Sequence, residues 1–281
     1  MNGCIRSSGE TTEQGSLTAR KGADGSRLQA RTGSTDMLII TGDTHNTYDG
    51  DRLFREDSPV LKHGLSKNDY LLIAGDFGYV WLGDERDDPE LDRLASLPVT
   101  VLFIDGNHEN FTALESYETR EWHGGKARYI RDSVIHLMRG EIYEIAGYSV
   151  FTFGGAYSVD KLFREEGLSW WPQELPSQEE YDHARENLQK HGNAVDLIVT
   201  HEVPTSLLKI LYERAKGYDL THFLEELDQT VTFEHWYCGH HHQEIEFDPK
   251  YTLLYTNYVC LENNTGRPEE VNGNDPEADN G

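Results

Sequence analysis

The sequence predicts an α/β fold, a sandwich of two sheets with helices outside it. Apolar runs of the buried-strand type, such as 99–104, alternate with helical patterns, which is typical of a largely parallel sheet with right-handed crossovers. Farther along, three short strand candidates at 134–138, 141–146 and 148–153 are separated by turn residues. They indicate antiparallel hairpins that form a second sheet.

One domain is expected, spanning residues 37–261. Residues 1–36 are rich in Gly, Ser, Thr and Arg and have almost no large apolar side chain, so burial cannot offset their ordering entropy. We expect a disordered N-terminal extension there, or a mis-called start, because a strand signature begins at Met37. Residues 262–281 are mostly Asn, Gly, Pro and acidic residues, which predicts an acidic disordered tail.

The first half of the domain is expected to place three strands in the parallel sheet. They are the runs 38–41, 70–74 and 99–104, and a helix from about Pro89 to Leu97 connects the last two. Each run ends at a glycine or a polar residue. This pattern delivers polar side chains to the carboxyl edge of a parallel sheet, where α/β proteins bind ligands.

The second half predicts two helices and the closing strands. Ser177 and Glu180 form a capping box, apolar residues follow at helical spacing, and Gly192 supplies a stop. Strand 195–200 ends at His201. A further helix is indicated by apolar residues at i, i+3, i+4 and i+7, and the remaining strands are expected at 236–238, 244–247 and 251–259.

Charge and composition restrict the partners. The chain has 50 acidic and 25 basic residues, a formal net charge of -25, which repels phosphate backbones and anionic membranes, so neither an extended nucleic acid nor a membrane is expected as a partner. No apolar run approaches the ~20 residues that span a bilayer, and the N-terminus lacks a secretory apolar region. Three cysteines without a Cys-x-x-Cys pair favour a reducing compartment. We therefore expect a cytoplasmic protein of unspecified oligomeric state.

Seven polar residues share one feature, a position just beyond a predicted strand. A single aspartate there is usually a turn residue, and a single histidine is usually a surface or core residue. As a set, carboxylate, imidazole and amide oxygen without thiolate predict a site for two divalent cations, Mn, Fe or Zn. The seven are Asp43, His45, Asp76, Asn107, His201, His240 and His242.

The order of these residues resembles a known signature. Five blocks are similar to the signature of the calcineurin-like metallophosphoesterase superfamily: Asp43-x-His45, Gly75-Asp76, Gly106-Asn107-His108-Glu109, His201 and Gly239-His240-x-His242. Segment 122–128 resembles a stretch in bacterial and phage-type members of this superfamily. The resemblance implies a four-layer αββα sandwich of two mixed sheets flanked by helices.

The resemblance also implies roles. One metal ion would be held by Asp43, His45 and His242, a second by Asn107, His201 and His240, and Asp76 would bridge them. His108 would be the catalytic residue that assists the leaving group. Glu109 is the nearest candidate in sequence to orient His108, and its alternative role is a helix N-terminal carboxylate.

The surroundings of these blocks give weaker indications of substrate contacts. Phe77 and Tyr79 are expected either to form an apolar wall beside the metals or to pack in the core. The segment 122–128 contains His123 and Arg128 and offers cations and glycines suited to phosphate. No arginine occurs in the few residues after Asp76, unlike in the protein phosphatases of the superfamily, and this absence favours a diesterase.

The expected activity is that of a dinuclear metal-dependent phosphoesterase. It would hydrolyse a small phosphodiester, or a phosphomonoester, by attack of a metal-bridging hydroxide while His108 assists the leaving group. A nuclease of the same superfamily is one alternative, which the acidic balance disfavours. A catalytically silent binding or scaffold relative is the other, which is disfavoured because all seven ligands and His108 are present.

Overall fold

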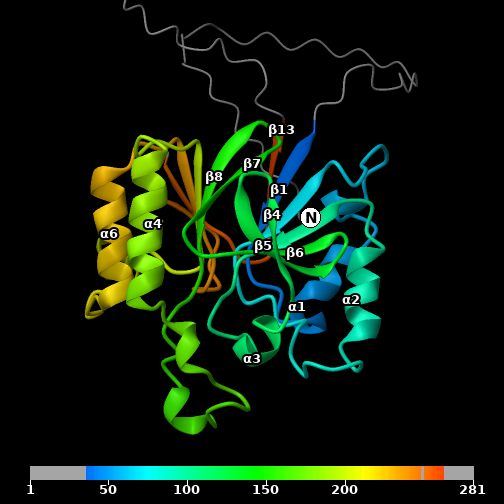
Figure 1. Cartoon of the computed structure of the whole chain (residues 1–281), viewed down its shortest axis with the longest axis horizontal. Coiled ribbons are helices and arrows are strands. Elements are labelled where there is room, and N and C mark those ends of the chain that lie inside the picture. The colour runs from blue at the N-terminus through cyan, green and yellow to red at the C-terminus, as the bar shows by residue number, and fades with distance from the viewer. Residues whose placement is uncertain (1–35, 248–249, 263–281) are drawn as a thin grey trace, which may run out of the picture.

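Two sheets pack face to face between helices in the computed structural model, which describes residues 36–247 and 250–262 (Figure 1). The predicted α/β class is confirmed. The expected N-terminal extension lies outside the described residues up to residue 35, and the expected tail lies outside them from residue 263. Glu262 itself still belongs to a strand, because it pairs with Met37.

The first sheet has seven strands in the order β13-β1-β2-β3-β6-β5-β4. Neighbours from β1 to β6 in this order run parallel, and β13, β5 and β4 add antiparallel edges. The strands are β1 (Met37–Thr41), β2 (Tyr70–Ile73), β3 (Thr100–Phe103), β4 (Thr119–Trp122), β5 (Gly125–Arg131), β6 (Val134–Leu137) and β13 (Tyr258–Glu262).

The second sheet has six strands in the order β11-β12-β10-β9-β8-β7. Its four central strands run parallel, and β7 and β11 are antiparallel edges. The strands are β7 (Glu141–Ile145), β8 (Tyr148–Phe153), β9 (Leu197–Thr200), β10 (His235–Cys238), β11 (Ile245–Phe247) and β12 (Tyr251–Leu253).

Two expectations about strand pairing were wrong. β6 does not join β7 and β8 in the second sheet but extends the first, with Val101 opposite Val134. The run 251–259 is not one strand, since β12 lies in the second sheet and β13 crosses to the first. Periodicity and turn residues locate strands, whereas partners are chosen by which buried faces meet.

Helices cover the outer face of each sheet (Figure 1). Apolar residues of α2 pack against the first sheet, and those of α4 and α6 pack against the second, with a third apolar layer between the sheets. The predicted capping box of α4 is present, and Gly192 beyond its end has φ 71°. The helices are α1 (Thr47–Gly50), α2 (Asp88–Ala95), α3 (Phe111–Leu114), α4 (Gln178–Lys190), α5 (Thr205–Leu211) and α6 (Asp219–Thr230).

Short 3-10 turns occur in the connections, at Asp51–Phe54, Pro59–Leu61, Lys161–Phe163 and Pro172–Glu174. Among the described residues, no helix combines the length and apolar character needed to cross a membrane.

Removing the cap of α4 should lower stability without changing the fold. The Ser177 hydroxyl accepts the Glu180 backbone N–H, and the Glu180 carboxylate accepts the Ser177 N–H at 2.7 Å. Ser177→Ala should reduce the free energy of unfolding by about 1 kcal/mol in urea titrations, and the capping-competent control Ser177→Thr should lose less. Equal losses in the two variants would contradict a capping role.

Candidate metal centre and its cleft

The seven candidate ligands converge because parallel strands of both sheets end at the same side of the sandwich. Asp43, Asp76 and Asn107 follow β1, β2 and β3, which are neighbours in the first sheet. His201 follows β9, and His240 and His242 follow β10, its parallel neighbour in the second sheet. Residues far apart in sequence thus meet where the carboxyl ends of five strands lie together.

One cluster of potential ligands contains Asp43, His45, Asp76 and His242, whose ligand atoms all lie within 4.8 Å of one another. Nε2 of His45 is 3.1 Å from Oδ2 of Asp76, and Nε2 of His242 is 3.0 Å from Oδ2 of Asp43. The rings of His45 and His242 meet edge to face, with centroids 5.0 Å apart. Two carboxylates and two imidazoles form a donor set suited to Mn, Fe or Zn.

A second cluster contains Asp76, His201 and His240, again with ligand atoms within 4.8 Å of one another. Nε2 of His201 lies 3.3 Å from Oδ1 of Asp76 and 3.2 Å from Oδ1 of Asn107. Asp76 therefore belongs to both clusters, one oxygen facing each. A carboxylate so placed can bridge two cations.

The orientation of these atoms fits bound cations. Oδ2 of Asp43 is buried and makes no hydrogen bond within the described residues, although Nε2 of His242 lies close to it. Asn107 donates its amide to Oγ of Ser158 at 3.1 Å, which leaves its Oδ1 facing His201. Nδ1 of His201 lies 2.8 Å from the Ala74 carbonyl and donates to it, so in the neutral ring Nε2 presents a lone pair. Lone pairs that face one another in this way indicate a positive charge between them.

The electrostatics also call for positive charge. Burial alone would raise the pKa of Asp76, but the charge of His201 and hydrogen bonds from His201 and His45 hold it well below its usual range. Burial lowers the pKa of His45, yet Asp76 and Asp43 outweigh burial and raise the pKa to about 9. The pKa of His201 is raised to about 10 against burial by the same two carboxylates. The two buried carboxylates therefore strongly favour positive charge beside them, and divalent cations can supply it while the histidines stay neutral and ligate.

The loops at this centre contain backbone conformations that are unusual for L-residues and a glycine that packs closely against Asp76. Asp76 and three of the histidine ligands, His45, His240 and His242, have positive φ, which L-residues adopt at a cost. A Cβ on Gly106 would lie 2.1 Å from Oδ1 of Asp76, so only glycine lets the β3 loop approach that carboxylate.

The comparison with known families agrees with this geometry. The model of the calcineurin-like phosphoesterases matches residues 37–244, well over half of the chain. The chain belongs to this family. No curated protein gives a significant match to it. Membership agrees with the two-sheet sandwich described above and makes this a metallophosphoesterase with buried Asp and His clusters for metal ions.

Residues outside the clusters hold the phosphoesterase ligands in place. Nδ1 of His45 is 2.9 Å from Oδ2 of Asp49, whose other oxygen accepts the Tyr255 hydroxyl. The ring of Tyr255 stacks on His242 at 4.4 Å. Contacts of this kind fix the tautomer and orientation of ligating histidines. No sequence pattern indicates Asp49 or Tyr255, because both roles depend on the packing of distant segments.

His108 lies at the edge of the centre. Its backbone N–H donates to Oδ1 of Asp76 at 2.8 Å, and its ring centroid is 5.4 Å from that of His45. The ring lines a cleft of about 800 Å³ that also contains Asp76, Asn107 and His240. His108 is thus next to both clusters, and its side chain is directed into the cleft.

Glu109 does not orient His108, and the helix N-terminal alternative is also wrong. Its buried carboxylate accepts the backbone N–H groups of Phe77 at 2.7 Å and Gly78 at 3.2 Å. Burial and the neighbouring charge of Asp76 raise its pKa to about 8. Glu109 therefore ties the β3 loop to the loop that follows Asp76.

The expected substrate contacts lie elsewhere. Phe77 and Tyr79 are 0% and 1% exposed and pack in the apolar layer beneath α2, so an aromatic wall beside the metals is wrong. His123 stacks on Trp122 in the β4–β5 hairpin, and Arg128 of β5 donates to His136 of β6. Neither residue lines the cleft beside His108. Isolated strand and loop patterns do not reveal which edge of a sheet a hairpin occupies.

Arg164 was missed by the sequence analysis. It comes from the connection between β8 and α4, which carries no block of the superfamily signature, and it reaches the cleft beside His108. Only the three-dimensional path of this segment brings the two residues together.

Asp76→Asn should lower metal occupancy at both positions. The amide removes the charge and one of the two acceptor oxygens that face the clusters. Elemental analysis after loading with Mn or Zn should show a clear loss relative to the wild-type chain. Asp84→Asn is a suitable control, because Asp84 is exposed and pairs with Arg86. Retention of two tightly bound ions by Asp76→Asn would contradict the bridging role.

Proposed function

We propose that this phosphoesterase hydrolyses a small phosphorylated substrate with two divalent cations of the Mn, Fe or Zn type. Asp43, His45 and His242 would hold one cation, Asn107, His201 and His240 the other, and Asp76 both. The observation that supports this proposal most strongly is the position of Asp76, which faces both clusters from the end of β2. Clusters of Asp and His can also bind a single metal ion. A carboxylate shared by two clusters is typical of enzymes that use two metal ions for phosphoryl transfer.

The two cations, when bound, would polarise phosphoryl oxygens and lower the pKa of a coordinated water, which makes it a nucleophile. The protein residues supply position and protons. Asp76 fixes the backbone of His108 by accepting its N–H, and the ring is thereby held in the cleft. We assign His108 to donate a proton to the leaving oxygen as its bond to phosphorus breaks.

The environment of His108 suits this assignment. Burial lowers the pKa of His108, the charge of Asp76 opposes that effect, and the charge of Arg164 adds to it. A lowered pKa makes the imidazolium a stronger proton donor, and an anionic phosphoryl group beside the ring favours its protonated form.

The aromatic residues after Asp76 and the lack of an arginine there do not distinguish a diester from a monoester in this structure. The aromatic residues Phe77 and Tyr79 are buried away from the cleft. No arginine stands directly after Asp76, but Arg164, from the connection between β8 and α4, reaches the cleft beside His108. We therefore propose a phosphohydrolase whose preference between monoesters and diesters must come from the cleft itself.

The cleft and the charge balance favour a small substrate. A cavity of about 800 Å³ accommodates a small molecule. A net charge of -25 opposes binding of an extended nucleic acid. A cytoplasmic location remains part of this proposal.

The activity can be tested by hydrolysis of p-nitrophenyl phosphate and bis-p-nitrophenyl phosphate after chelation and reloading with Mn, Fe, Zn or Mg. Turnover that disappears on chelation and returns with metal would support the proposal. Two bound ions without turnover of either ester would count against hydrolysis of simple phosphoesters.

His108→Ala should lower turnover by about 10²- to 10⁴-fold, the range for loss of a general acid. Metal content should stay at the wild-type level, because the backbone N–H that reaches Asp76 is retained. Steady-state kinetics and elemental analysis on the same samples separate the two effects. An unchanged rate would remove His108 from the mechanism.

A further inference from the structure

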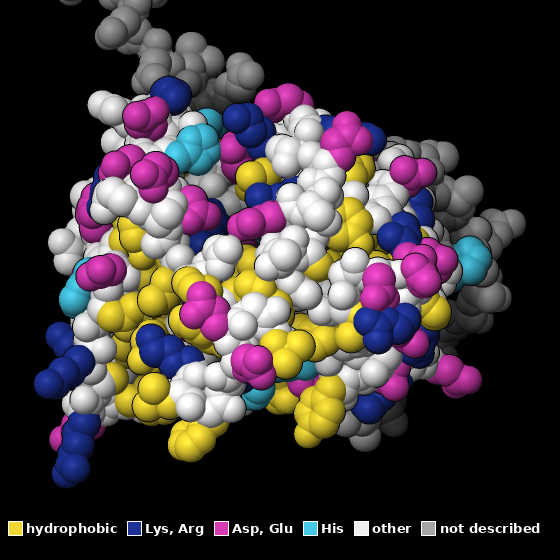
Figure 2. All heavy atoms as spheres, turned by 60° about the horizontal axis from the view of Figure 1, so that its bottom comes forward, with side chains coloured by type: hydrophobic (Ala, Val, Ile, Leu, Met, Phe, Trp, Pro, Cys, Tyr) yellow, Lys and Arg dark blue, Asp and Glu magenta, His cyan; other side chains and the backbone are white. Residues whose placement is uncertain are grey.

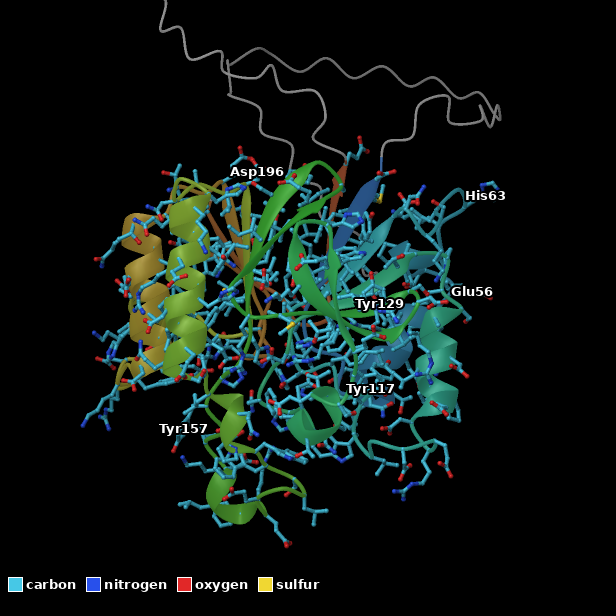
Figure 3. All side chains as sticks on the ribbon, in the orientation of Figure 1. Glu56, His63, Tyr117, Tyr129, Tyr157 and Asp196 are labelled. Atoms are coloured by element: carbon cyan, nitrogen blue, oxygen red, sulfur yellow. The ribbon has the colours of Figure 1, made fainter. Side chains whose placement is uncertain are left out.

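The connection between β8 and α4 projects from the end of the sandwich at which the ligands converge. It leaves the second sheet after Phe153 and is visible at the bottom of Figure 1. Figure 3 labels Tyr157 at its start. Figure 2 turns this end forward and shows hydrophobic side chains grouped on it. Val159, Leu162 and Phe163 are the most exposed large apolar residues of the segment. Residues 157–160 and Arg164 line the cleft, so the segment forms one of its walls.

Arg164 is directed from this wall toward the metal centre. Its guanidinium lies 3.0 Å from Nε2 of His108 and 3.3 Å from Nδ1, and its side chain is only 14% exposed. Asp160 pairs with it at 2.9 Å, and the Ser169 carbonyl lies 3.4 Å away. These two contacts restrain the guanidinium beside His108.

Arg164 and His108 form an unusual pair. Both groups donate hydrogen bonds when charged, and a guanidinium in contact with an imidazole disfavours the imidazolium. Asp160, the one carboxylate that pairs with Arg164 in the described chain, is half exposed on the same segment. A guanidinium in contact with His108, in a cleft that Asp76 also lines, is positioned for an anion that enters the cleft.

We propose that Arg164 is a substrate-binding residue for the phosphoryl group, and that it makes phosphomonoesters the preferred substrate class. This inference rests on the proposed phosphohydrolase function. A guanidinium binds phosphate oxygens through paired N–H donors. The exposed wall segment would deliver this cation from outside the strand ends that carry the candidate metal ligands.

The preference for monoesters follows from counting oxygens and charges. A phosphomonoester offers three non-bridging oxygens and close to two negative charges, whereas a diester offers two such oxygens and one charge. Two metal ions and the guanidinium of Arg164 provide three positive groups, one for each non-bridging oxygen of a phosphomonoester. In a diester the third position carries an ester substituent, so Arg164 would have less to bind and would be crowded by that substituent.

The kinetic test compares Arg164→Gln, Arg164→Lys and the wild-type chain on p-nitrophenyl phosphate and bis-p-nitrophenyl phosphate. Arg164→Gln should lower kcat/KM for the monoester by about 10- to 100-fold, since a hydrogen bond to a charged group is lost, and should change the diester rate much less. Arg164→Lys should recover part of the monoester rate, because it keeps the charge without the paired donors. Equal losses on both esters would overturn the preference.

Two controls separate binding from structure. Lys161→Gln removes a cation from the same segment at a residue that does not line the cleft, and it should leave both rates unchanged. Added guanidinium should partly restore the monoester rate of Arg164→Gly. An equal loss in Lys161→Gln would indicate general electrostatics and overturn the assignment.

Binding of inorganic phosphate to the metal-loaded protein provides a readout that needs no turnover. Calorimetry should show a dissociation constant raised about 10- to 100-fold in Arg164→Gln with unchanged metal content. Unchanged phosphate affinity would overturn the role of Arg164. If the wild-type chain binds phosphate through Arg164 but hydrolyses neither ester, the proposed hydrolysis fails while the binding site stands.

Discussion

The structure depends on two buried carboxylates, Asp43 and Asp76, which are 0% and 1% exposed. A buried negative charge is costly unless positive charge or hydrogen bonds compensate it. Histidine rings from both sheets and backbone N–H groups surround this pair, among them those of His108 and His240. The glycines and strained backbone of the loops serve the same requirement, because they let these groups approach the carboxylates closely. A metal-dependent phosphoesterase needs such a concentration of charge, and its family supplies the context for it.

The two-sheet sandwich makes this concentration possible. Parallel strands of both sheets end on one side, so loops from separate parts of the chain reach the same point. A buried ion pair also holds the two sheets together beside the centre. Arg139, in the connection between the sheets, pairs with Asp105 at 2.6 Å. Burial raises the pKa of the Asp105 carboxyl, but Arg139 and His136 outweigh burial and hold it well below its usual range. The loop that carries Asn107 and His108 therefore begins at a charge-paired residue.

The cleft combines a centre built from strand ends with a wall built from a connection. The centre contains the candidate metal ligands at the strand ends, whereas the wall segment contributes Arg164, Tyr157 and exposed apolar residues. Loops carried on a rigid scaffold commonly set specificity in this way. Chemistry and substrate preference would then be located in separate parts of this chain.

The sequence by itself determined the fold class, the capped helix α4 and the group of candidate ligands. These features are local: periodicity, capping residues and polar residues after buried strands are properties of short segments. Tertiary structure decided the sheet to which β6 belongs, the burial of Phe77 and Tyr79, the role of Glu109 and the arrival of Arg164 beside His108. Each of these depends on contacts between segments distant in sequence, where the burial of faces and the pairing of charges outweigh local preference.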